Sequence, residues 1–364
     1  MKLISLVLSF LAFTCFVFAS ETDAVSSTKN GTADSNFFVI VPIPLYSPET
    51  GWALNINSAY LYRTEPEDKD TTPSIIQVSL VYSEKNQTDD YLEINHYLKG
   101  NEYIFKGILQ YKKYPDSFFG TGNYTLPGDS EKYTIEYEYF MAESYKKIVP
   151  GFYAGLRYVF QNNALLEVEP SGLLAQAPGR RGLRQSGAGL LLKWDTRDYV
   201  YYATDGALHQ VSFLSFGPGI GSQNIFNKFE ADFRWFFPAF EGQSGSVHAY
   251  AALSGGDVPF FFMPFIGGDK MLRGYFKGRF RDKNMIALQA EYHFHLSELF
   301  IITIHAATGE VMKEVTDFST SGLKFSAGAG LRFVLEPKDR LTARLDLGFT
   351  PDSMGVYLMA GEAY

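Results

Sequence analysis

Apolar and polar residues alternate in steps of two along most of this chain, and this pattern constrains the fold more than any other feature. Residues 341–349 read LTARLDLGF, with Leu, Ala and Phe at one set of positions and Thr, Arg, Asp and Gly at the other. The same alternation occurs over 134–141, 228–235, 286–295 and 323–333. Because successive side chains of a strand point to opposite faces, each stretch predicts a β-strand with one apolar and one polar face.

The number of such stretches favours a membrane barrel over a soluble sandwich, which would show the same alternation. The predicted strands start near Asn36, Gly51, Ser74, Tyr91, Glu102, Tyr133, Gly151, Gly187, Gly206, Lys228, Ser246, Met285, Leu299, Gly322, Leu341 and Met354. An even number of strands of about ten residues is typical of outer-membrane barrels. No apolar run of about 18 residues follows Phe18, so no membrane helix is predicted beyond it. We therefore predict an all-β fold, a 16-stranded antiparallel transmembrane β-barrel.

The first residues predict export from the cytoplasm. Lys2 precedes an apolar run over 3–18, and the small residue Ala19 follows it, as in a secretory signal peptide. We expect a signal peptide over 1–19, a flexible periplasmic segment over 20–35 and the barrel over 36–364. The alternatives are a membrane anchor, for which the run is short, and lipidation of Cys15. Cys15 is the only cysteine, so the exported chain is expected to have no disulfide.

Three long connections are expected over 114–131, 162–186 and 255–284. They are rich in polar residues, glycine or proline, but the third also carries apolar residues over 260–266. A solvated loop does not need such residues, so this segment is expected to pack against the barrel. A glycine-rich motif follows in the same connection and consists of Gly267, Gly268, Leu272, Arg273, Gly274 and Tyr275.

This motif, between the predicted eleventh and twelfth strands, resembles the inward-folding sixth loop of the BamA and TamA superfamily, also called the bacterial surface antigen family. Two other segments agree. The stretch with Asp195, Arg197 and Asp198 is similar to the family's eighth-to-ninth strand segment, and 328–346 is similar to its penultimate hairpin. The resemblance covers nearly the whole predicted barrel and implies a long loop between strands 11 and 12 that folds into the lumen.

Arg273 is the residue of the loop that most needs partners. A guanidinium in a barrel lumen is costly unless carboxylates bind its planar fork. The resemblance implies that Arg273 is held by acidic residues on the inner wall, and Glu291 matches one of these positions. Relatives usually carry a second acid on the next strand, but this chain has Ala307 there. In the other interpretation, Arg273 is an ordinary solvated loop residue.

Enzymatic interpretations find little support in the sequence. The motifs G-x-S-x-G, H-E-x-x-H and the P-loop are absent. His293 and His295 share a predicted lumen face with Glu291 and could hold a metal, yet a polar lumen wall explains the same residues. Asp195, Arg197 and Asp198 fit a salt-bridged rim better than acid chemistry. We predict no enzyme, no metal and no cofactor.

The resemblance implies a protein of the Gram-negative outer membrane that acts in membrane-protein insertion, assembly or translocation. Its expected partners are membrane lipid and unfolded or nascent membrane proteins. The formal net charge of -8 argues against nucleic acid as a partner. The family's periplasmic docking modules do not fit into 20–35, so none is expected in this chain.

A lateral seam between the first and last strands is the predicted route for such clients. Pro42 and Pro44 lie in the first strand and cannot donate ladder hydrogen bonds, and Tyr364 matches the terminal aromatic residue of exported barrels. Glu362 departs from that pattern, which has an apolar or aromatic residue there. Two alternatives remain, a passive pore for small polar solutes and a structural surface antigen.

Overall fold

The computed structural model describes residues 18–21, 36–65, 71–180, 184–199, 202–336 and 341–363. The predicted signal peptide over 1–19 and the predicted flexible segment over 20–35 lie outside these residues, apart from β1 (Phe18–Glu21). This short strand pairs antiparallel with the start of β2 (Phe37–Ser47). No helix in the described ranges is long and apolar enough to cross a membrane.

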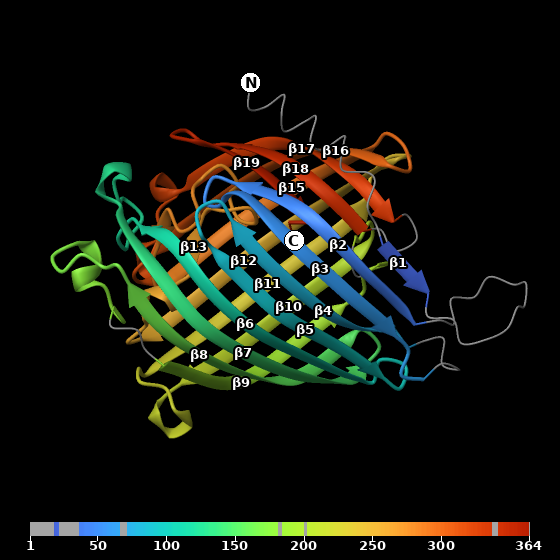
Figure 1. The fold of residues 1–364 in the computed structure, drawn as a ribbon, viewed down its shortest axis with the longest axis horizontal. Coiled ribbons are helices and arrows are strands. Elements are labelled where there is room, and N and C mark those ends of the chain that lie inside the picture. Colours follow the sequence, from blue (N-terminus) through green and yellow to red (C-terminus); the bar gives the residue numbers. More distant parts are fainter. Residues whose placement is uncertain are drawn as a thin grey trace, which may run out of the picture.

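Sixteen strands form a closed antiparallel barrel (Figure 1). They are β2, β3 (Gly51–Tyr62), β4 (Ser74–Ser83), β5 (Thr88–Leu98), β6 (Tyr103–Phe118), β7 (Glu131–Val149), β8 (Phe152–Leu166), β9 (Arg184–Asp195), β10 (Gly206–Phe216), β11 (Phe226–Pro238), β12 (Gln243–Gly256), β15 (Asn284–His295), β16 (Phe300–Met312), β17 (Lys324–Glu336), β18 (Leu341–Phe349) and β19 (Met354–Ala360). Each pairs with the next, and β19 returns to β2. The barrel confirms the predicted fold class.

The predicted strand starts all lie within three residues of the observed ones. Two predicted connections are partly wrong, because β6 continues to Phe118 and β8 to Leu166, inside the stretches 114–131 and 162–186. Phe118 pairs with Glu131, so the β6–β7 hairpin keeps its ladder to the very end. Where a strand projects beyond the lipid, its ladder hydrogen bonds can continue although its outer face is no longer apolar. The alternation of apolar and polar residues therefore does not reveal where such a strand ends.

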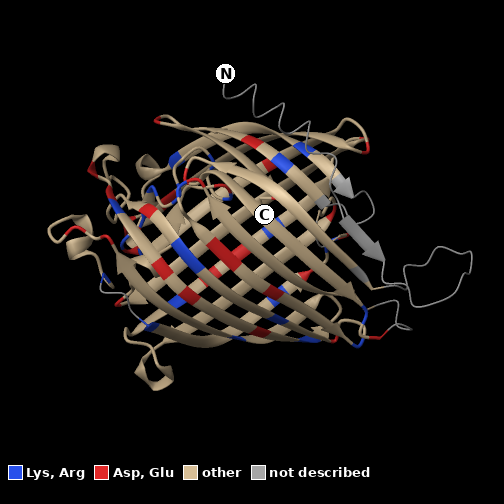
Figure 2. Cartoon of the chain, viewed as in Figure 1, with Lys and Arg blue, Asp and Glu red and all other residues tan. Residues whose placement is uncertain are grey.

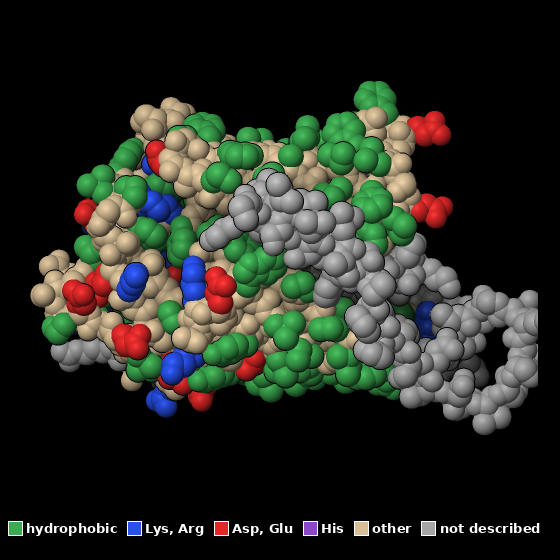
Figure 3. Space-filling view, turned by 45° about the horizontal axis from the view of Figure 1, so that its top comes forward, with side chains coloured by type: hydrophobic (Ala, Val, Ile, Leu, Met, Phe, Trp, Pro, Cys, Tyr) green, Lys and Arg blue, Asp and Glu red, His purple; other side chains and the backbone are tan. Residues whose placement is uncertain are grey.

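The barrel has its charges inside and its hydrocarbon outside. Arg332, Arg344 and Asp346 lie in mid-strand and are at most 1% exposed, whereas Ile304 is 49% and Phe325 55% exposed. Figure 2 shows charged positions along the strands, and Figure 3 shows hydrophobic side chains over the outer wall. This distribution is the reverse of that in a soluble protein and fits a barrel with lipid outside and a polar lumen.

The two ends of the barrel differ in their connections. The turn end carries 99–102, 150–151, 239–242 and 296–299, together with the described parts of 63–73 and 196–205. The loop end, toward the left in Figure 1, carries 48–50, 84–87, 119–130, 167–180, 217–225, 257–283, 313–323 and 350–353. The longest connections, among them 257–283, therefore lie at the loop end.

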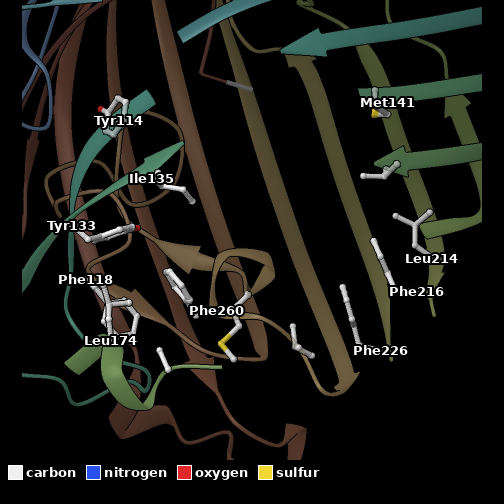
Figure 4. Close-up of a cluster of buried hydrophobic side chains, with 14 residues drawn as sticks. Tyr114, Phe118, Tyr133, Ile135, Met141, Leu174, Leu214, Phe216, Phe226 and Phe260 are labelled. Carbon is white, nitrogen blue, oxygen red and sulfur yellow. The ribbon is translucent and has the colours of Figure 1, made fainter. Parts of the chain in front are cut away.

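An apolar cluster occupies the lumen toward the loop end (Figure 4). It joins the inner faces of β6–β8, β10 and β11 to the connections 167–180 and 257–283. Phe260 packs edge-on against Phe118 with ring centroids 5.1 Å apart, and Phe216 stacks on Phe226 at 4.1 Å. Hydrocarbon from two connections therefore fills a part of the lumen that would otherwise hold water.

Candidate functional site

The connection 257–283 contains a small antiparallel pair, β13 (Phe265–Ile266) with β14 (Phe280–Arg281), and a sharp turn between them. Gly267 and Gly268 begin this turn with φ of 110° and 100°, a region that favours glycine. A Cβ at Gly267 would lie 2.0 Å from the carbonyl oxygen of Phe276. The turn therefore requires glycine, and it directs the following residues toward the barrel wall.

The connection packs against β15 and β16 on one side and approaches β18 on the other. Leu272 and Tyr275 belong to an apolar cluster with Met285 of β15. A Cβ at Gly274 would lie 2.8 Å from Thr350 Cγ2, and one at Gly348 would lie 2.5 Å from the carbonyl oxygen of Arg273. Glycine at both positions, one in the connection and one in β18, permits the close approach that brings Arg273 to the inner wall.

Arg273 is 2% exposed and binds two carboxylates. Its guanidinium pairs with Glu291 of β15, the partner predicted from the sequence, and its Nη1 lies 2.8 Å from Asp346 Oδ2 of β18. The second carboxylate therefore comes from β18 and not from the position of Ala307 on β16. The alternation of Arg344 and Asp346 on the polar face of the predicted strand is the signal that could have identified it.

Asp346 is the centre of a buried ion-pair network. Besides Arg273, it pairs with Arg332 Nη1 at 2.5 Å and with Arg344 Nη1 at 2.6 Å. Arg344 Nη2 in turn lies 2.8 Å from Asp269 Oδ2, so the connection is joined to β18 at a second point. Removing one partner from such a buried network leaves an uncompensated charge, at a cost of about 3–5 kcal/mol.

Glu362 belongs to the same network and explains its departure from the apolar residue expected near the carboxyl end. Its carboxylate lies 3.0 Å from Arg332 Nε and accepts a hydrogen bond of 2.7 Å from Thr342 Oγ1. Both partners face the lumen from β17 and β18. Glu362 therefore ties the segment after β19 to the inner wall.

The seam between β2 and β19 has fewer paired residues than any other pair of neighbouring barrel strands in the described ranges. Among the described residues it contains one residue pair, Leu358 with Tyr46, whereas β18 pairs along the whole of β19. Pro42 and Pro44 lie in β2 and are in register with β3, but neither has an N–H group to donate. Few ladder bonds therefore join the first and last barrel strands.

A cavity of about 880 Å³ extends through the lumen from the connection 257–283 toward the turn end. Its walls include the segment 261–271, charged side chains of β11, and Tyr202 and Glu362 near the turn end. The cavity is polar on the β11 side and meets aromatic side chains where the apolar cluster begins.

Sequence comparison now decides the family, because the Omp85 superfamily domain matches residues 72–337. The chain belongs to the Omp85 superfamily. Members of this superfamily are transporters or assembly factors of the outer membrane, in accord with the apolar outer wall. Comparison with curated protein sequences finds no significant match.

Solved structures share the fold of this Omp85 chain. BamA from Haemophilus ducreyi lacking POTRA domains 1–3 matches with a TM-score of 0.62 and 13% identity, over 98% of this chain and 78% of that one. CdiB from Escherichia coli matches with a TM-score of 0.61 and 13% identity, over 95% of this chain and 67% of that one. CdiB from Acinetobacter baumannii gives 0.58 and 12%, over 95% and 65%.

The predicted strand 8–9 motif lies at the turn end of this Omp85 barrel, while Arg273 contacts the middle of β15 and β18. Arg197 Nη2 lies 2.8 Å from Asp195 Oδ2. Asp198 Oδ1 accepts a hydrogen bond of 2.8 Å from the N–H of Thr204, inside the connection 196–205. The motif therefore shapes this turn, and the structure does not bring it together with the loop.

Tyr202 is a lumen residue that sequence reasoning missed. It lies in the connection 196–205 and is 6% exposed, and its hydroxyl is 2.9 Å from His293 Nδ1 and 3.3 Å from His295 Nε2. His293 Nε2 is 3.3 Å from Glu291 Oε2. Within the described ranges, no group of three His, Cys, Asp or Glu residues is placed to hold a metal. Tyr364, a predicted seam residue, lies outside the described residues.

Proposed function

We propose that this Omp85 barrel inserts membrane proteins, or translocates exported chains, by opening the seam between β2 and β19 while the connection 257–283 keeps the lumen plugged. The observation that carries the proposal is the single residue pair of the seam, Leu358 with Tyr46. Every other pair of neighbouring barrel strands has a longer register. The seam is therefore where the least hydrogen bonding opposes opening.

An opened seam offers the edge of β19 and the edge of β2 beyond Ile40, where pairing with β1 ends, with unpaired N–H and C=O groups inside the bilayer. Such groups are costly in lipid and are satisfied by an incoming strand, which adds to the sheet by β-augmentation. Pro42 and Pro44 have no backbone N–H, so β2 lacks two hydrogen-bond donors. They lie two residues apart, so they affect the same edge of the strand, while the register with β3 continues through both.

A plugged lumen separates this function from passive diffusion. Arg273 fixes the connection to β15 and β18 by ion pairs, and Phe260 of the same connection packs into the apolar cluster. A passive pore needs a continuous polar path, and hydrocarbon packed inside the lumen opposes such a path. The barrel is therefore expected to conduct small ions poorly while its arginine is in place.

The test measures the rate at which an unfolded outer-membrane barrel folds into vesicles that contain this protein, read as the heat-modified band on a semi-native gel. All variants carry Cys15→Ser. Tyr46→Cys with Leu358→Cys places a disulfide across the seam. Gly107→Cys with Ala142→Cys, a direct pair between β6 and β7, is the matched control.

The proposal predicts that the protein without the seam disulfide accelerates folding of the client barrel. The seam disulfide should abolish this acceleration, and reduction of the disulfide should restore it. The β6–β7 disulfide should leave the rate unchanged, because this hairpin does not need to open. Equal rates with the seam locked and unlocked would refute the proposal.

A further inference from the structure

Residues 274–277 of the connection bind the last barrel strand. The N–H of Gly274 donates to the Tyr357 hydroxyl of β19 at 3.1 Å, and this hydroxyl donates to the carbonyl oxygen of Tyr275 at 3.4 Å. Tyr357 is fully buried. Ser353, in the turn between β18 and β19, donates to the carbonyl oxygen of Gly274 at 2.8 Å. One side of the seam is thus bonded to this short segment.

The same segment also binds the other side of the seam. The N–H of Lys277 donates to Glu49 Oε1 at 2.7 Å, and Glu49, in the turn between β2 and β3, is 5% exposed. The carbonyl oxygen of Glu49 accepts hydrogen bonds from Lys85 Nζ at 2.9 Å and Gln87 Nε2 at 3.2 Å. The β2–β3 turn is therefore tied to the β4–β5 turn, and both are tied to the loop.

We propose that residues 274–277 form a clasp across the loop end of the seam, with Tyr357 and Glu49 as the positioning residues that hold β19 and β2 closed. The inference rests on the proposed lateral opening. Arg273 fixes the base of the clasp to β15 and β18, so movement of the loop and opening of the seam become one event. Release of the Glu49 bond frees the β2–β3 turn, and release of the Tyr357 bond frees β19.

Glu49 acts in the clasp as a buried hydrogen-bond acceptor. Burial raises the pKa of this carboxyl above its ordinary value, although the N–H of Lys277 and the Ser47 hydroxyl act in the opposite direction. The other titratable groups that face it are the Lys277 ammonium and, from neighbouring elements, Lys85, Tyr114 and Tyr357. A neutral amide oxygen accepts the same hydrogen bond, so glutamine should preserve the clasp and alanine should break it.

The experiment measures the distance across the seam by pulsed electron paramagnetic resonance in the refolded full chain. Spin labels replace Leu54 of β3 and Phe349 of β18 in a Cys15→Ser background. Both positions are 50% exposed and lie one strand back from the seam, so the labels leave the seam pair intact. The readout is the ratio of the long-distance to the short-distance population.

Glu49→Ala removes the bond from the Lys277 N–H and should raise this ratio by about tenfold, the change that corresponds to about 1.4 kcal/mol for one lost buried hydrogen bond. Tyr357→Phe removes two hydrogen bonds and should raise the ratio at least as much. Glu49→Gln should leave the ratio near that of the wild type. The controls are Glu84→Ala, an exposed carboxylate in the neighbouring turn, and Tyr137→Phe, whose hydroxyl binds Gln110 away from the seam. Neither control should change the ratio.

The clasp is overturned if Glu49→Ala behaves like Glu84→Ala, or if Glu49→Gln opens the seam as far as alanine does. A semi-native gel reports folding, and if Glu49→Ala fails to fold, Tyr357→Phe decides by itself because it removes only a hydroxyl. The measurement needs no client protein. The two proposals can therefore fail separately. If Glu49→Ala changes the spin-label distances but the barrel with the seam disulfide still accelerates insertion, the clasp is supported and the proposed function is refuted.

Discussion

The seam and the β6–β7 hairpin each join two neighbouring strands of one barrel, yet the two junctions differ greatly in how their strands are paired. The β6–β7 ladder is continuous over all of β6, and the apolar cluster packs against its inner face. The seam has one residue pair and two prolines in β2. A net contribution of about 0.5–1.5 kcal/mol for each hydrogen bond makes the first junction far stronger. A closed barrel can therefore be rigid on one wall and weak on another.

The largest effect is expected from breaking the strong wall. Ala142→Pro removes a donor from the middle of β7, which pairs with both β6 and β8. Residue 142 lies far from either end of its strand and is paired on both sides, a position where proline is poorly tolerated, so no heat-modifiable barrel should form. Ala142→Ser at the same position should fold normally. A proline variant that folded as well as the serine variant would show that this wall is not the stable part.

The next largest effect is expected from freeing the loop. Arg273→Ala leaves Glu291 and Asp346 without this guanidinium, at a cost of about 3–5 kcal/mol. The folded band should convert at lower temperature, and the single-channel current should become larger and steadier. Arg157→Ala, which removes an ion pair with Glu143 on the opposite wall, should lower stability without raising the current. An unchanged current for Arg273→Ala would contradict a loop-plugged lumen.

A smaller effect is expected from strengthening the seam. Pro42→Ala with Pro44→Ala restores two N–H donors to β2, each worth about 0.5–1.5 kcal/mol if it pairs. The long-distance population between the labels at Leu54 and Phe349 should fall, and client insertion should slow. Pro115→Ala in β6 supplies a proline control within a long ladder. If the double variant and the control behave alike, the prolines do not weaken the seam.

The smallest effect is a pH dependence of the clasp. Burial raises the pKa of Glu49 above its ordinary value of 4.5, so the closed state binds this proton more tightly than the open state. The stabilisation is present below about pH 4.5 and is lost as pH rises through the raised pKa. The unfolding temperature of wild type minus that of Glu49→Gln should therefore fall between pH 4 and pH 8. A flat or rising difference would contradict the burial of this carboxyl.

The sequence was sufficient for the barrel because lipid outside and water inside impose an alternation that can be counted. It also predicted Glu291 as a partner of Arg273, through a resemblance supported by the lumen-facing register of β15. The sequence did not predict the ends of β6 and β8, because strand ends that project beyond the lipid need no alternation of apolar and polar residues. Ladder pairing continues there without a lipid-facing pattern.

The remaining site residues could not be predicted because their partners are distant in the chain. Asp346 reaches Arg273, and Glu49 reaches Lys277, only because the closed sheet brings their strands to one lumen wall. Tyr357 appears in the sequence as one more aromatic residue in a terminal strand. Its hydrogen bonds to residues 274 and 275 depend on the depth that the loop reaches.

Backbone hydrogen exchange of the folded barrel in a bilayer, resolved strand by strand, tests the central claim most directly. Exchange reports the free energy of local opening. The account predicts that amides of β2 and β19 exchange much faster than those of β6 and β7, and that Glu49→Ala increases the difference further. Equal protection of the seam and the β6–β7 hairpin would contradict it, because the barrel would then have no weak junction to open.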